Sequence, residues 1–169
     1  MREAPWRLLV VLLSAVCTSC TTRDVRSVDS AGVDHERATV ELYPATLLAR
    51  IGDSLSRGRA TGSTLNRHPT FFYIEGRRVS TGVPEVHDGW TDIALVQAGH
   101  ATLLTGGRVD GSHVESPGEH RGGNIIDGTS RPVGAGDLLV IPAGTAHQFM
   151  ISTGDSLRYL TVKVAAVAR

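Results

Sequence analysis

A histidine at position 147 follows a tight turn that comes directly after an apolar strand. Leu138 to Ile141 has the composition of a short buried strand, and Pro142 and Gly144 mark the turn after it. The return strand begins at His147, which then points inward with the apolar residues at alternate positions. This layout predicts an imidazole at the mouth of a β-barrel, where it can bind a divalent metal ion.

A second segment pairs a carboxylate with another imidazole. Glu85 and His87 are two residues apart. Residues at this spacing share one face of a strand, so both side chains are expected to point into the same barrel.

The spacing of these two segments resembles the motifs of the cupin superfamily. The second cupin motif runs Gly, five residues, Pro, one residue, Gly, two residues, His, and it is matched in full from Gly136 to His147. The first motif reads His-x-His, three or four residues, Glu, six residues, Gly. Here Glu85 replaces the first histidine, His87 is the second, Asp92 replaces the glutamate and Gly99 closes the motif. The resemblance implies a cupin barrel (double-stranded β-helix, or jelly roll).

The resemblance also implies a metal site made of Glu85, His87, Asp92 and His147. Imidazoles and carboxylates are the mixture that divalent iron, manganese, nickel or zinc accept, and two histidines with one carboxylate form the facial arrangement of non-haem iron enzymes. A buried carboxylate needs a partner, and a dication supplies one. The alternative is that these residues line a wet pocket and hydrogen-bond to one another.

The composition fits one exported domain of ordinary size. The chain has 169 residues, 17 basic and 17 acidic, and its formal net charge is zero. No basic stripe or aromatic cluster indicates nucleic-acid binding. We expect a small-molecule ligand as the partner, and cupin relatives suggest a possible homodimer.

The amino terminus has the features of a lipoprotein signal peptide. Arg2 and Arg7 lie in a charged start, and the apolar run that follows, Leu8 to Val16, is too short to span a bilayer. The segment Thr18 to Cys20 resembles the lipoprotein cleavage box, so residues 1–19 are expected to be removed and Cys20 lipidated. Thr21 suits the outer membrane, on the periplasmic side. The alternatives are plain secretion and an uncleaved anchor.

The remaining chain is predicted to be an all-β barrel with a short N-terminal helix. Residues 20–41 form a polar tether, 42–68 a helix and a loop, and 69–169 the barrel. The helix has Pro44 in its first turn and packs outside the barrel, and Ser63 to His68 is predicted as a loop. Candidate strands are Thr70 to Glu75, Arg77 to Ser80, Glu85 to His87, Asp92 to Gln97, Ala101 to Thr105, Leu138 to Ile141, His147 to Ser152 and Leu157 to Val164.

The glycine-rich stretch from Gly106 to Gly136 is longer than the usual connection between the two motifs. Long ordered loops are often functional, so we expect a short strand near Asn124 to Asp127 and a partial cover for the pocket. Glu119 and His120 are candidates for an additional metal ligand or a catalytic acid or base, with Glu119 the better one. Trp90 either forms a wall of the pocket or packs in the core.

The letters Gly52-Asp53-Ser54-Leu55 resemble the nucleophile block of GDSL-type esterases, a remote alternative. That family needs an α/β sandwich, and strands dominate after Ser54. Three classes of function stay open. They are a metal-dependent oxygenase, lyase or isomerase, a metal-free module that binds a sugar or acid, and a structural lipoprotein.

Overall fold

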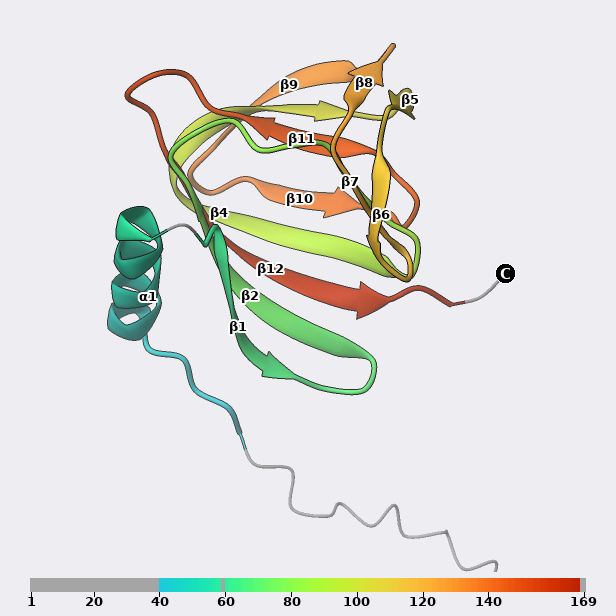
Figure 1. Ribbon diagram of the computed structural model, residues 1–169. Coiled ribbons are helices and arrows are strands. Elements are labelled where there is room, and N and C mark those ends of the chain that lie inside the picture. The colour runs from blue at the N-terminus through green and yellow to red at the C-terminus, as the bar shows by residue number, and fades with distance from the viewer. Residues whose placement is uncertain (1–39, 59, 168–169) are drawn as a thin grey trace, which may run out of the picture. The chain divides into compact units, whose positions relative to one another are not determined.

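Alternating apolar and polar residues form strands through most of the chain after Gly62. The computed structural model describes residues 40–58 and 60–167. Leu42–Arg169 forms one compact unit (Figure 1). Its elements are α1 (Ala45–Arg57), β1 (Gly62–Arg67), β2 (Phe71–Arg78), β3 (Glu85–His87), β4 (Trp90–Thr105), β5 (Arg108–Asp110), β6 (His113–Ser116), β7 (Glu119–Arg121), β8 (Asn124–Ile126), β9 (Thr129–Gly134), β10 (Leu138–Ile141), β11 (His147–Met150) and β12 (Leu157–Ala165).

Strand β4 connects the two halves of the barrel. Its first ten residues, Trp90 to Gly99, pair with β12, and part of this stretch pairs with β10 on the other side. Its last residues pair with β9 and β11. The antiparallel sheet runs β1-β2-β12-β4-β11-β3-β7-β6, and β5 and β8 form a separate two-stranded sheet. The predicted all-β barrel with a short N-terminal helix is confirmed.

The apolar core lies between the inward faces of the barrel strands. Residues two apart along a strand share a face, so the alternating buried positions of β12 and β4 meet inside the barrel. The core cluster consists of Ala94, Val96, Ala101, Leu103, Val133, Ile141, Phe149, Ile151, Leu157 and Tyr159.

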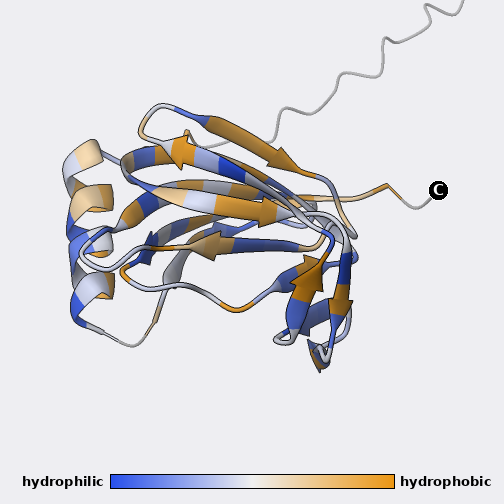
Figure 2. Ribbon diagram, turned by 90° about the horizontal axis from the view of Figure 1, so that it is seen from above, coloured by the Kyte–Doolittle hydropathy of each residue, from blue (hydrophilic) through white to orange (hydrophobic). Residues whose placement is uncertain are grey.

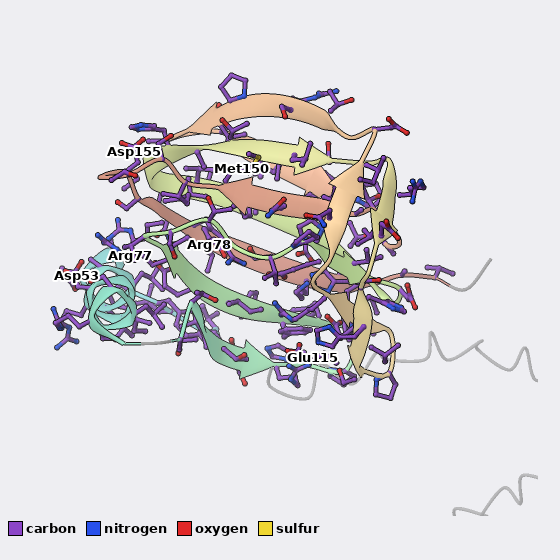
Figure 3. All side chains as sticks on the ribbon, turned by 45° about the horizontal axis from the view of Figure 1, so that its top comes forward. Asp53, Arg77, Arg78, Glu115, Met150 and Asp155 are labelled. Atoms are coloured by element: carbon purple, nitrogen blue, oxygen red, sulfur yellow. The ribbon has the colours of Figure 1, made fainter. Side chains whose placement is uncertain are left out.

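Helix α1 covers the outside of β1 and β2, as predicted. It begins after Pro44 and ends before Gly58. Leu55 is buried, and Leu48 and Ile51, which share its side of the helix, are half-buried. Figure 2 shows the apolar residues of α1 on the side toward the sheet. At the helix surface, Asp53 and Arg77 of β2 form an ion pair of 3.3 Å (Figure 3).

A fully buried carboxyl lies under this helix. Glu75 of β2 points outward from the barrel, where α1 shields it from water. Gln97 Nε2 donates a hydrogen bond of 3.3 Å to Glu75 Oε2, and Arg158 Nε lies 3.9 Å from Oε1. Burial raises the pKa of Glu75 from 4.5 to about 7, although Arg158 and Gln97 oppose the shift.

The raised pKa of Glu75 predicts a loss of stability as the pH rises. The folded protein disfavours the ionised carboxyl. The contribution of Glu75 to the free energy of unfolding is therefore full below pH 4.5 and is lost as the pH rises to about 7. A shift of this size corresponds to about 3 kcal/mol. Glu75→Gln, which resembles the protonated acid, should therefore be more stable than the wild type at pH 8 and similar to it at pH 4.5. Urea unfolding at both pH values tests this. The same difference in unfolding free energy between Glu75→Gln and the wild type at both pH values would contradict it.

One predicted loop is a strand. Ser63 to His68 was expected to be a loop because its polar residues do not alternate with apolar ones. In the structure, Gly62–Arg67 forms β1 at the edge of the sheet, hydrogen-bonded to β2. Backbone pairing with a neighbour that is already ordered holds this strand, so it needs no apolar pattern of its own.

The two strands predicted on either side of Gly99 are one continuous strand, β4. Gly99 has φ 77°, and the close approach of the Ser156 carbonyl leaves no room for a Cβ there. The sheet therefore turns sharply at Gly99 without ending. The strand predicted near Asn124 to Asp127 is confirmed as β8.

The predicted signal peptide, Cys20 and most of the tether lie outside the described residues. Among the residues that the structure does describe, no helix is long and apolar enough to cross a membrane.

Candidate metal and ligand site

A cavity of about 570 Å³ occupies the interior of the barrel. Strands β1, β2, β12 and β4 form one wall, and β3, β7 and β11 form the other. Ser116 at the end of β6 and Pro117 in the turn that follows also line it. Part of the glycine-rich stretch thus lines the cavity, and its role as a cover stays a prediction. The volume lies within the usual range for small-molecule sites.

All four residues of the predicted metal site lie in this cavity and are buried. His87 Nε2 is 3.6 Å from Glu85 Oε2 and 3.6 Å from Asp92 Oδ2. His147 Nε2 is 3.9 Å from the same oxygen of Asp92. Glu85, His87 and His147 each offer one ligand atom within 4.8 Å of the others. The structure therefore places a tight group of three donors with Asp92 beside both histidines.

Strand pairing explains how distant residues meet. His147 on β11 lies directly opposite Glu85 on β3. On the other side of β3, Glu119 and Arg121 of β7 lie opposite His87 and Glu85. The backbone N–H of Gly144 donates to the carbonyl of His87 at 2.9 Å, which ties the turn before His147 to β3.

Both histidines turn the same ring nitrogen toward the centre of the group. Nδ1 of His87 is hydrogen-bonded to Glu119, and Nδ1 of His147 lies 3.0 Å from the carbonyl oxygen of Thr145. Because these acceptors take the Nδ1 proton, Nε2 presents its lone pair to the cavity, as metal ligation requires. Burial lowers the pKa of His147, which keeps its imidazole neutral at pH 7.

Each carboxylate uses one oxygen for a cation and leaves the other facing the histidines. Glu85 Oε1 accepts from Arg78 at 2.7 Å and lies 2.9 Å from Arg121. Lys163 Nζ donates to Asp92 Oδ1 at 2.6 Å. Burial alone would raise the pKa of Glu85, but the two arginines lower it below its usual value. The Glu85 carboxyl is thus held in its ionised form, and partners on other strands orient both side chains.

The other predicted residues divide between the cavity and the surface. Glu119 and Trp90 line the cavity. The rings of Trp90 and Phe72 meet edge to face, with 4.9 Å between their centroids. His120 points away from it and pairs with Asp88 at 2.8 Å. Ser54 lies on α1 and donates to a helix carbonyl, so it does not stand at the end of a buried strand, where a GDSL-type esterase needs its nucleophile.

Sequence reasoning missed the cations of the site. Arg78, Arg121, Lys163 and Arg67 all line the cavity. A period-two pattern could have indicated Lys163, which shares the inward face of β12 with Tyr159 and Thr161. Nothing in the sequence indicated Arg67, because its segment was predicted to be a loop.

The chain matches no known family model and no curated protein. Solved structures do resemble it. The Bacillus halodurans protein BH2720 matches with TM-score 0.52 and 16% identity over 79% of this chain and 87% of its own. The Neisseria meningitidis protein NMB1881 matches with TM-score 0.50 and 12% identity over 73% and 99%. A cupin 2 conserved barrel domain protein from Rhodopseudomonas palustris matches with TM-score 0.43 and 23% identity over 66% and 68%.

The fold is an antiparallel jelly-roll barrel, and BH2720 and NMB1881 share it. The predicted fold class is therefore confirmed. Identities this low show a shared fold and carry no activity over to this chain.

Proposed function

We propose that Glu85, His87, Asp92 and His147 hold a divalent transition metal and that the barrel binds or acts on a small organic molecule beside it. The observation that supports the metal is Nε2 of His87, which is buried without a hydrogen-bond partner in the described part of the chain. One carboxylate oxygen of Glu85 and one of Asp92 each lie 3.6 Å from it. A buried nitrogen without a partner costs free energy, whereas a cation at this point would bind all three atoms.

The donor set fits iron, manganese, nickel or zinc. When bound, such an ion would supply Lewis-acid or redox chemistry. The protein's own residues orient the donors. Glu119 orients the ring of His87 through a hydrogen bond with Nδ1. We propose Glu119 as the positioning residue of His87, and the proton-transfer role predicted for it stays a prediction.

Metal titration of the full chain, purified in mild detergent and freed of metal by chelator, tests the proposal. We expect one Zn²⁺ or Mn²⁺ per chain by calorimetry. His113→Ala is the matched control, because His113 is exposed on β6 and lies outside the cavity. Failure of the wild type to bind any of these ions would contradict the proposal.

One observation favours a metal-free binding module instead. Arg78 and Arg121 already neutralise Glu85, and Lys163 neutralises Asp92. The two carboxylates of the proposed metal site thus already have cationic partners without a metal ion. Under this second proposal the barrel would hold its organic ligand through the same polar residues, and the titration above would show no metal.

We further propose that the protein is exported and anchored by a lipid on Cys20, on the periplasmic side of the outer membrane. The support is the sequence of residues 1–20, with its charged start, short apolar run and cleavage box.

Replacement of Cys20 by serine is expected to move the protein from the membrane fraction to the soluble fraction, because it removes the lipid attachment site. Fractionation and immunoblotting measure this. Cys17→Ser serves as the control and should leave the protein in the membrane fraction. A Cys20→Ser protein that stays with the membrane would point to an uncleaved anchor.

A further inference from the structure

One row of inward-facing residues crosses five strands of the barrel. Arg67 of β1 lies opposite Phe72 of β2, Phe72 opposite Lys163 of β12, and Lys163 opposite Asp92 of β4. Ile141 of β10 completes the row next to Asp92. All five line the cavity. The row therefore leads from the edge strand of the barrel to the proposed metal site.

A β-bulge places Arg67 in this row. The register between β1 and β2 shifts between Thr64 and Asn66, so one extra residue lies in β1. Without the extra residue, Asn66 would face Phe72. The bulge moves Arg67 into that position and turns its side chain toward the cavity. Bulges beside functional sites commonly redirect a side chain in this way.

Arg67 forms no ion pair with any acid among the residues that the structure describes. Its guanidinium lies over the ring of Phe72, 3.8 Å from the centroid. This contact fixes the position of the charge and leaves the N–H donors of the guanidinium available. Arg67 is thus a preoriented cation at the border of the cavity.

The charges of the cavity favour an anionic ligand. Its three carboxylates, Glu85, Asp92 and Glu119, are matched by the three cations Arg78, Arg121 and Lys163. Arg67 is left as an excess positive charge, and a divalent ion would add two more. An anion entering this space gains electrostatic free energy that a neutral molecule does not.

The cavity also offers an apolar wall for a carbon skeleton. Phe72 and Trp90 meet edge to face, and Ile141 and Phe149 line the same space. Because the apolar wall and Arg67 adjoin at Phe72, one small molecule can contact both.

We propose that the site takes a small organic carboxylate, with its carboxylate bound by Arg67 and its carbon skeleton against Phe72 and Trp90. The inference rests on the small-molecule binding proposed above, but not on the metal. Lys163, whose ammonium has further N–H donors beyond the one given to Asp92, adds positive potential deeper in the cavity.

Matched pairs of acids and amides test the proposal with the full chain in detergent. The probes are benzoate and benzamide, phenylacetate and phenylacetamide, and succinate and succinamide. Binding is measured by calorimetry and by the shift in Tm. We expect at least one acid to bind, at least about tenfold more tightly than its amide, because a hydrogen bond to a charged group is worth that much.

The variant Arg67→Gln should bind that acid about tenfold more weakly, because it keeps a polar side chain but loses the charge. Arg131→Gln is the matched control, because Arg131 is exposed on β9 and does not line the cavity. Equal binding of acid and amide, no binding of any acid, or unchanged acid binding by Arg67→Gln would overturn the proposal.

Metal content, determined on the same samples, keeps the two proposals apart. Acid binding that depends on Arg67, in a protein that takes up no metal when each ion is supplied, would refute the metal site and support the carboxylate site. Metal binding without acid binding would support the metal site and refute the carboxylate site.

Discussion

Replacement of His147 by alanine is expected to weaken Zn²⁺ or Mn²⁺ binding by about a hundredfold or more, since losing even an outer partner of a ligand costs ten- to a hundredfold. The barrel should stay folded, because His147 borders an existing cavity and does not fill the apolar core cluster. Calorimetric titration and circular dichroism of the metal-free protein measure the two effects.

His113→Ala is again the control, and its metal affinity should equal that of the wild type. A His147→Ala protein that is folded and binds metal as the wild type does would remove His147 from the site. If His147→Ala fails to fold, the test uses His147→Gln instead, because glutamine fills nearly the same space and is a much poorer ligand.

Replacement of Glu85 by alanine is expected to destabilise the protein by about 3 to 5 kcal/mol, because it leaves a buried charge without its partner. Arg78 is the charge concerned, since 11% of its side chain is exposed and its short ion pair is with Glu85. Arg121 is less affected, with 32% of its side chain exposed and a second partner in Glu115. Urea unfolding at pH 7 measures the loss. A decrease below about 1 kcal/mol would show that water reaches Arg78 freely.

The double variant Glu85→Ala with Arg78→Met separates the ion pair from the space that it fills. Methionine removes the buried charge and keeps much of the volume, so the double variant should recover a large part of the lost stability. It should not recover metal binding, because Glu85 supplies a donor oxygen. A double variant less stable than Glu85→Ala would contradict the electrostatic explanation.

The meeting of the proposed donors in one cavity could be expected from the sequence because Glu85, His87 and His147 lie in local patterns. Two residues at spacing two on a short strand, and one histidine after a Pro and Gly turn, define where the side chains point. The partners of these donors depend on strand register instead. Glu119 is 32 residues from His87, and Lys163 is 71 residues from Asp92. Nothing local in the chain specifies which strands of an antiparallel barrel are neighbours.

Arg67 shows the limit of pattern reading most clearly. Its strand lacks apolar alternation, so it was predicted as a loop, and a bulge then changes which of its residues face inward. A shift of one residue reverses every later side chain on a strand. The sequence alone therefore gives no indication of Arg67, the residue that we propose selects the ligand.

The metal content of the full chain, purified in detergent without chelator and without nickel resin, tests the central claim most directly. We predict close to one equivalent of iron, manganese, nickel or zinc by elemental analysis in the wild type, and almost none in His147→Ala. An absence of metal in the wild type, even after each ion has been supplied and the excess removed, would contradict the metal site and leave the metal-free binding barrel as the account of this fold.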